Sequence, residues 1–131
     1  MMEKVLVSGS AGFIGGYVVG ELLDRGYEVV GLDNLSKYGK VAKSYDGHPH
    51  YRLVEGDARD IALLTGLLAD CDHFIAGAAM IGGISYFHAY PYDLLATNER
   101  IIAAPHPEYA GLETGKPVAD VWNVLGQGVV V

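Results

Sequence analysis

Several residue types are scarce in this chain of 131 residues, and each scarcity excludes a class of protein. A single cysteine, Cys71, excludes an internal disulfide and is typical of a reducing compartment. Nine basic residues against sixteen acidic ones give a net charge of −7, which argues against a nucleic-acid-binding face. The longest run of apolar residues and glycines, 74–84, is shorter than the roughly 20 residues of a membrane span. With no secretory signal at its start, we expect a cytoplasmic chain without membrane or nucleic-acid partners.

Glycine, in contrast, is abundant, with 18 residues in the chain. These glycines follow no three-residue period, which excludes a collagen-like fibre. Half of the residues are hydrophobic and 19% are charged, which is the balance of a globular protein. The length predicts a single domain over residues 1–131.

The beginning of the chain alternates between strand and helix patterns. The apolar run Lys4–Ser8 predicts a strand that is buried on both faces. Apolar residues then recur at four-residue spacing from Ile14 to Leu22, which predicts a helix that ends at Gly26. Residues 27–32 predict a second strand.

The same alternation continues after a polar loop at 36–50. Strands are predicted at 51–55 and 72–76, a helix capped by Asp60 lies between them, and another helix follows Pro91. The fold class is therefore α/β, a Rossmann-like doubly wound parallel sheet with Lys4–Ser8 in its interior. From 105 onward the composition changes, and we expect a short helix at 117–125 and a last strand at 129–131.

Three glycines, Gly9, Gly12 and Gly15, lie between the first expected strand and the first expected helix. Glycine allows the backbone to turn sharply and to approach a pyrophosphate without an obstructing Cβ atom. The helix N-terminus offers free N–H groups and the positive end of its dipole to the phosphates. Gly15 and Gly16 are further expected to let the helix lie close to the sheet. The alternative interpretation of this motif is a tight turn without a ligand.

An acidic residue, Asp33, ends the second expected strand 18 residues after Gly15. This is close to the spacing of about 20 residues expected for a carboxylate that binds the adenosine ribose. A 2′-phosphate would be repelled there, so the sequence favours NAD over NADP. The alternative is that Asp33 and Asn34 only cap a turn. The lysines of the following loop are interpreted as solvated; they are Lys37, Lys40 and Lys43.

Four segments within the first 104 residues carry a family resemblance. They are Gly-Ser-Ala-Gly-Phe-Ile-Gly at 9–15, Gly-Leu-Asp-Asn-Leu-Ser at 31–36, Val-Glu-Gly-Asp-Ala-Arg-Asp at 54–60 and Gly-Ala-Ala at 77–79. Together they resemble the extended short-chain dehydrogenase/reductase family, and within it the NAD-dependent epimerases and dehydratases of nucleotide sugars. The resemblance implies that NAD contacts Gly9, Gly12, Phe13, Ile14, Gly15, Asp33, Asn34, Asp57, Ala58, Ala78 and Ala79. In relatives the residues matching Asp57 and Ala58 lie beside the adenine.

The loop at 79–84 and the segment from Pro91 to Asn98 are similar to members that act on GDP-sugars. Members acting on UDP-sugars have related segments, so the base of the nucleotide stays open. The resemblance implies substrate contacts at Ser85, Tyr86 and Asn98. The alternative for Ser85 and Tyr86 is that they only belong to a loop that leads into the helix. The alternative for Asn98 is a capping or surface asparagine. In relatives the helix after Pro91 forms a dimer contact, which implies a homodimer. Ordinary core packing is the competing interpretation for its apolar residues, Leu94, Leu95, Ile101 and Ile102.

The resemblance ends at about residue 104, and 105–131 form a divergent tail. Relatives continue with a strand bearing Ser or Thr and then Tyr-x-x-x-Lys, whereas here no tyrosine has a lysine four positions later. We therefore assign no catalytic residue. We expect an incomplete, inactive NAD-binding portion of such an enzyme, from a truncated, frame-shifted or rearranged gene. The alternatives are a non-catalytic nucleotide-binding or sensing module and a protein that depends on a partner chain.

Other candidate constellations are weaker. His48 and His50 flank a proline near Asp46, but no second cluster of ligands has a recognisable spacing, so no metal is expected. Cys71 stands between two aspartates with no nearby cation to lower its pKa, which argues against a nucleophile.

Overall fold

The computed structural model describes residues 2–81, 84–104 and 118–119. Its sheet has the order β3-β2-β1-β4-β5, and every neighbouring pair is parallel. The strands are β1 (Lys4–Ser8), β2 (Glu28–Asp33), β3 (Tyr51–Glu55), β4 (His73–Ala76) and β5 (Val118–Ala119). The helices are α1 (Phe13–Asp24), α2 (Ile61–Ala69), α3 (Ile84–Ala89) and α4 (Pro91–Ala103). The α/β class, the parallel sheet and the interior position of β1 are thus confirmed.

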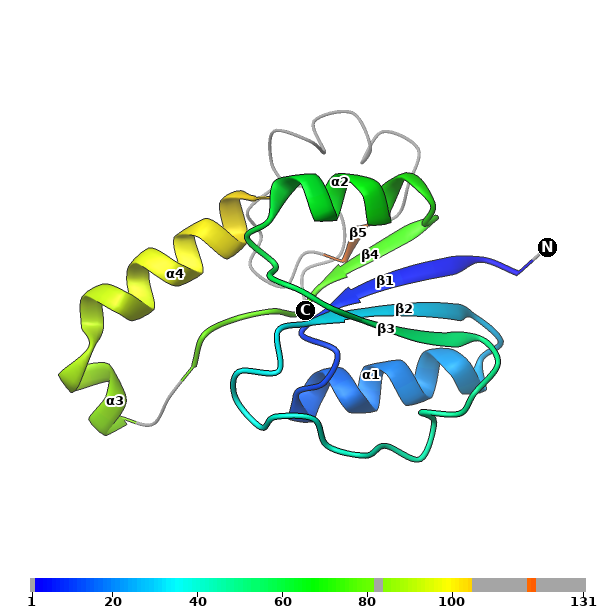
Figure 1. Cartoon of the computed structure of the whole chain (residues 1–131), viewed down its shortest axis with the longest axis horizontal. Coiled ribbons are helices and arrows are strands. Elements are labelled where there is room, and N and C mark those ends of the chain that lie inside the picture. Colours follow the sequence, from blue (N-terminus) through cyan, green and yellow to red (C-terminus); the bar gives the residue numbers. More distant parts are fainter. Residues whose placement is uncertain (1, 82–83, 105–117, 120–131) are drawn as a thin grey trace.

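Helices α1 and α2 cover opposite faces of the sheet (Figure 1). Successive side chains of a strand point to opposite faces, so each strand contributes to both layers. The buried core on the α2 side consists of Leu6, Val30, Leu32, Leu64, Leu68, Cys71, Phe74 and Ala104. The buried core on the α1 side consists of Val5, Val7, Val19, Leu23 and Val29. This burial on both faces explains the nearly continuous apolar sequence of β1 and β2.

Two predicted helix ends are confirmed, the end of α1 at Gly26 and the start of α2 at Asp60. Gly26 follows α1 with a φ of 88°, and its N–H donates to the carbonyl of Leu23 at 3.0 Å. The N–H of Tyr27 donates to the carbonyl of Leu22, which completes a Schellman motif. At the start of α2, the Asp60 carboxylate accepts a hydrogen bond from the N–H of Leu63 at 3.0 Å.

Two local predictions are wrong. Ser85 and Tyr86, expected in a loop that leads into the Pro91 helix, lie instead on the separate helix α3, whose six residues include no glycine or proline. Val118 and Ala119, expected in a helix that begins at Pro117, instead form β5 beside β4. Pairing with the open edge of β4 satisfies backbone groups there, so tertiary context overrides the helical spacing. The remainder of the helix predicted at 117–125 and the strand predicted at 129–131 lie outside the described residues.

Within the described ranges, no helix is both long and apolar enough to cross a membrane.

Candidate functional site

The loops that leave β1 and β4 meet at the carboxyl edge of the sheet. The chain builds outward from β1 to β2 and β3, and then returns to place β4 on the other side of β1. In such sheets the reversal point leaves a crevice for ligands between the two central strands. Here a Cβ atom on Gly9 would lie 2.8 Å from the carbonyl oxygen of Gly77 and 2.9 Å from the backbone nitrogen of Ala78. The two loops therefore touch backbone to backbone, and a side chain at Gly9 would separate them.

The three glycines of the turn after β1 have different structural roles. Gly9 has a φ of 73°, a conformation that suits glycine, and its N–H donates to the carbonyl of Leu32 at 2.8 Å. Gly15 faces the carbonyl of Gly9, and a Cβ atom there would overlap that oxygen. Gly12 has an ordinary φ of −75°, and a Cβ atom on it would meet only the Gly9 oxygen, at 3.3 Å. The fold itself thus requires glycine at positions 9 and 15 more strictly than at position 12.

Helix α1 begins immediately after this turn. Its N-cap, Gly12, provides no side-chain capping bond, and its first turn contains no acidic residue. The N–H groups of the first turn, including those of Phe13 and Ile14, have no acceptor within the helix. The side chains of Phe13 and Ile14 are 70% and 75% exposed. This terminus has the positive potential and the donors that an anion requires.

Asp33 links the end of β2 to the glycine turn. Its Oδ2 atom accepts a hydrogen bond from the N–H of Ala11 at 3.0 Å, and its Oδ1 atom accepts one from the N–H of Leu35 at 2.8 Å. Asn34 caps its own turn, since its Oδ1 accepts from the N–H of Ser36 at 3.0 Å. The turn-capping interpretation is therefore confirmed for both residues. Each carboxylate oxygen has a second lone pair, so capping leaves Asp33 able to accept from a ligand.

The end of β3 adjoins Asp33, because the N–H of Gly56 donates to the carbonyl of Asp33 at 3.0 Å. The Asp57 carboxylate is held by Arg59, whose Nη2 lies 2.6 Å from Oδ2 and whose backbone N–H donates to Oδ1 at 2.8 Å. These bonds from Arg59 lower the pKa of Asp57, against the opposing effect of burial. Ala58 packs on the apolar core of the α2 side. The sequence analysis does not predict the ion pair between Arg59 and Asp57, although the two residues are close in sequence.

The loop after β4, residues 77–81, carries Ala78 and Ala79 and is held by side chains from two other elements. The buried hydroxyl of Ser8 accepts from the N–H groups of Gly77 and Ala78, each at 3.2 Å. Asn98 of α4 pairs with the backbone of Met80 through two hydrogen bonds of 2.7 and 2.8 Å. The sequence predicts a role for Asn98, but it predicts neither its partner Met80 nor the role of Ser8. The signal for Ser8 is that it is a polar residue at the end of a buried strand.

The proposed substrate residues Ser85 and Tyr86 lie on α3, which is displaced from the sheet edge (Figure 1). Both are exposed, and the ring of Tyr86 lies 5.0 Å from that of Tyr90. The structure thus does not bring these residues to the glycine turn, whereas it does bring Asn98 to the loop after β4.

Two glycines have neighbours that differ from those expected. Gly16 was expected to let α1 approach the sheet, but a Cβ atom there would meet Lys43 Nζ at 3.2 Å, in the polar loop. Gly15 does allow a close approach, but to the glycine turn itself, at Gly9 and Ser10. Gly31 of β2 was not singled out, yet Ser10 of the glycine turn packs directly against it. Glycine inside a strand often marks such a close contact.

Residues 5–103 match the model of the NAD dependent epimerase/dehydratase family. The chain belongs to this family. The glycine turn and Asp33, at the carboxyl edge of the sheet, lie wholly within the matched range.

The individual relatives are named for different functions. The chain is 46% identical over 78 residues to the low-salt glycan biosynthesis protein Agl12 of Haloferax volcanii, with 57% of this chain and 25% of that protein covered. The structure of DesIV, a dTDP-glucose 4,6-dehydratase from Streptomyces venezuelae with NAD and TYD bound, matches with a TM-score of 0.77 at 31% identity. That match covers 88% of this chain and 38% of DesIV. The structure of UDP-glucose 4-epimerase from Bifidobacterium longum, in complex with NAD+ and UDP, matches with a TM-score of 0.71 at 27% identity, over 88% of this chain and 36% of that one. The chain thus spans a quarter to two fifths of these proteins.

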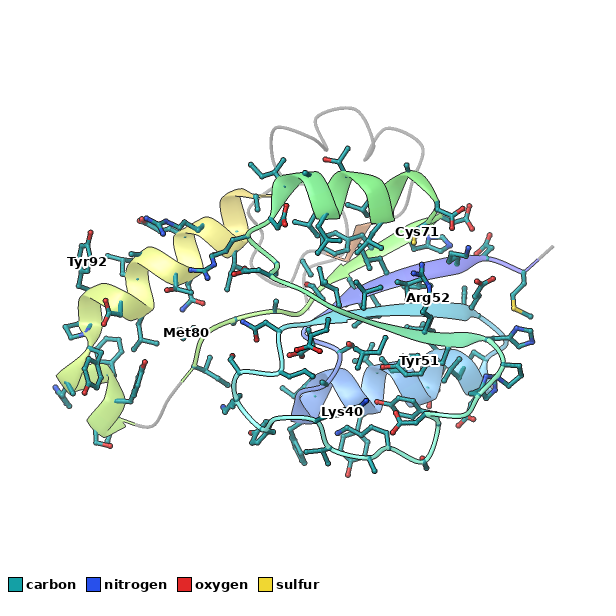
Figure 2. The ribbon with its side chains drawn as sticks, viewed as in Figure 1. Lys40, Tyr51, Arg52, Cys71, Met80 and Tyr92 are labelled. Atoms are coloured by element: carbon teal, nitrogen blue, oxygen red, sulfur yellow. The ribbon has the colours of Figure 1, made fainter. Side chains whose placement is uncertain are left out.

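Two other groups of residues are placed away from this edge. Cys71 lies at the amino end of β4, at the opposite end of the sheet (Figure 2), and burial raises the pKa of its thiol to about 11. A thiol with that pKa is protonated at neutral pH and is a poor nucleophile. In the described part of the chain, no three His, Cys, Asp or Glu side chains are grouped so that they can hold a metal ion.

Proposed function

We propose that this chain binds NAD(H) at the carboxyl edge of its sheet, as the NAD-binding portion of a nucleotide-sugar epimerase or dehydratase. The observation that carries the proposal is the backbone contact between Gly9 and Gly77 at the point where the strand order reverses. In parallel sheets of this kind ligands bind at that point, and the glycine turn, the N-terminus of α1 and Asp33 all lie at this end of the sheet. The family match supports NAD as the dinucleotide.

The residues at this edge suit the parts of a dinucleotide. The uncapped first turn of α1 offers N–H donors to the pyrophosphate, and Gly12 leaves room for it because no Cβ atom projects there. The Asp33 oxygens retain lone pairs for the adenosine ribose hydroxyls, and their charge disfavours the 2′-phosphate of NADP. Asp57 and Ala58 border the adenine in this proposal, and Ala78 and Ala79 border the nicotinamide side. When bound, NAD supplies the hydride acceptor.

Fewer observations support the substrate than support the cofactor. The relatives named above support a nucleotide sugar, and the dTDP- and UDP-glucose enzymes among them leave the base unassigned for this chain. Of the three candidate substrate residues, Asn98 is the one that is bonded to the loop after β4, through Met80. Because Tyr-x-x-x-Lys is absent from the sequence, we propose that this chain binds the cofactor without turning over a sugar.

A homodimer through α4 is also part of the proposal. Leu94 is 7% exposed and belongs to the chain's own interior, whereas Leu95 is 61% exposed and is available to a second copy. Sedimentation velocity at several protein concentrations tests this contact. A Leu95→Glu variant is expected to stay monomeric at concentrations where the unmodified chain dimerises, and a concentration-independent monomer contradicts the proposed dimer.

Titration with NADH, followed by fluorescence or calorimetry, tests the proposed function. We expect Gly12→Val to abolish binding because its side chain occupies the space of the pyrophosphate, while the ordinary φ of this position tolerates valine. Gly47→Val is the matched control, since a Cβ atom there meets nothing within 4 Å. Circular dichroism and urea unfolding confirm that both variants fold. Absence of binding at millimolar NADH to the unmodified chain contradicts the proposal.

A further inference from the structure

The loop after β4 is fixed at both of its ends by side chains from distant parts of the sequence. At its start, the Ser8 hydroxyl accepts from Gly77 and Ala78, across separations of 69 and 70 residues. At Met80, the loop is fixed by Asn98, across a separation of 18 residues. Figure 2 shows Met80 on the segment that leaves the sheet toward α3. The intervening Ala79 is therefore held between two anchors.

The contact between Asn98 and Met80 uses the whole amide group. Asn98 Oδ1 accepts from the N–H of Met80 at 2.7 Å, and Asn98 Nδ2 donates to the carbonyl of Met80 at 2.8 Å. Both bonds are partly buried, and both have good lengths for hydrogen bonds between neutral groups. A strand neighbour satisfies a backbone in the same reciprocal way, so Asn98 replaces a sheet partner where β4 has already ended.

The amide side chain supplies a donor and an acceptor side by side at any pH near neutrality. Aspartate lacks the donor when it is ionised, and leucine lacks both groups. Asn98 lies in the interior of α4, where its side chain caps no helix terminus, so the capping interpretation does not apply. Its two bonds connect α4 to the loop after β4, and Ala104, which follows α4, joins the core on the α2 side.

We propose that Asn98 is a positioning residue that sets the backbone of loop 77–81 before NAD binds, with Ser8 as the second anchor. The inference rests on the proposed function, because it is the cofactor that benefits from the preset loop. A loop that is ordered in advance does not have to be ordered at the expense of binding affinity. Asn98 itself acts through Met80 and requires no contact with the cofactor.

Amide hydrogen exchange of the unliganded full chain, measured by NMR, tests the anchor directly. In Asn98→Leu we expect the Met80 amide to lose its protection, while amides of β1 and β2 keep theirs. Calorimetric titration with NAD+ is then expected to show a Kd about tenfold higher, which corresponds to about 1.4 kcal/mol. The control is Glu99→Gln, an exposed neighbour on the same helix, which is expected to match the unmodified chain in both measurements.

The isosteric variant Asn98→Asp separates positioning from folding. When protonated, its carboxyl group donates to the Met80 carbonyl; when ionised, it repels that oxygen, and this contact raises the pKa of the new carboxyl group. We expect its Kd for NAD+ to rise as the pH increases from about 5.5 to 8, relative to the unmodified chain. If Asn98 serves only the stability of the fold, no such pH dependence is expected in a folded Asn98→Asp variant.

The outcomes distinguish this inference from the proposed function. A Met80 amide that stays protected in Asn98→Leu, or a Kd unchanged in both variants, overturns the anchor while NAD binding stands. If the unmodified chain does not bind millimolar NAD+, the proposed function fails and the positioning role toward NAD fails with it. The exchange data then still show whether Asn98 holds the loop.

Discussion

The carboxylate of Asp33 accepts a hydrogen bond from the backbone N–H of Ala11, 22 residues earlier, at 3.0 Å. This bond fixes the glycine turn after β1 to the end of β2. The second oxygen of the same carboxylate fixes Leu35, whose φ of 59° is unusual for a residue with a side chain. Asp33 therefore holds the glycine turn and the loop after β2 in place, in addition to any contact with a ribose.

The first prediction concerns Asp33→Ala. Because the N–H groups of Ala11 and Leu35 lose their acceptor, we expect the free energy of unfolding to fall by about 1–3 kcal/mol. We also expect the Kd for NADH to rise at least about tenfold and the preference for NADH over NADPH to shrink, since the repulsion of a 2′-phosphate is removed. Urea unfolding and parallel titrations with both cofactors measure these effects.

Asp33→Asn separates the two roles of this side chain. It is isosteric and keeps one oxygen acceptor, so we expect a smaller loss of stability together with a weakened preference for NADH. If the ratio of the two Kd values is the same in all three proteins, Asp33 does not discriminate between the cofactors.

The second prediction compares two glycines on α1. In Gly15→Ala the new methyl group overlaps the carbonyl oxygen of Gly9, so α1 must move away from the turn. We expect a loss of several kcal/mol, in the range of overpacked sites, or failure to fold. In Gly20→Ala the methyl group meets nothing within 4 Å, and we expect stabilisation by about 0.5–1 kcal/mol from helix propensity. Urea unfolding of both variants is the measurement, and equal effects contradict the assigned packing.

The site features that could be predicted from sequence are those with a local cause. The glycine turn and the Asp60 cap each depend on residues within a few positions of one another, and Asp33 is recognised by its place at the end of the second strand. The alternation of apolar strands and helices likewise fixes the two-sided core, because burial on both faces of β1 requires a continuous apolar run.

The features that escaped prediction depend on contacts between distant residues. The acceptor role of Ser8 appears only when β4 ends beside β1, and the partner of Asn98 appears only when α4 lies beside the loop after β4. Val118 and Ala119 belong to a segment that is expected to be a helix, but their conformation is decided by the edge of β4. Helix α3 has six residues, which are too few for a helical period of apolar residues to be recognised.

The third prediction uses Cys71 as a probe of folding. The thiol is 4% exposed, and burial raises its pKa to about 11. At pH 8 the thiolate fraction is then roughly 100-fold smaller than for an unperturbed cysteine, and access is restricted as well. We expect a disulfide reagent such as DTNB to react at least about 100-fold faster in urea than in buffer. Comparable rates in the two solvents contradict the burial.

The same shift has a consequence for stability at alkaline pH. The folded thiol stays neutral while the unfolded thiol ionises, so its contribution is fully present below about pH 8.5 and declines as the pH rises toward 11. We expect the free energy of unfolding to fall less steeply between about pH 9 and 11 in Cys71→Ala than in the unmodified chain. Identical slopes in the two proteins contradict this contribution.

The last prediction is that this chain alone neither epimerises nor dehydrates a nucleotide sugar. Removal of a hydroxyl proton needs a positioned base with a tuned pKa, and acid–base catalysis of this kind contributes typically 10²–10⁴-fold. No tyrosine here has a lysine four positions later to tune it, and Tyr86 and Tyr90 lie on or beside α3, away from the glycine turn. Incubation with NAD+ and a panel of dTDP-, UDP- and GDP-sugars, followed by chromatography of the products, is the measurement. Turnover that persists in Tyr86→Phe and Tyr90→Phe contradicts the prediction and locates the catalytic base elsewhere in the chain.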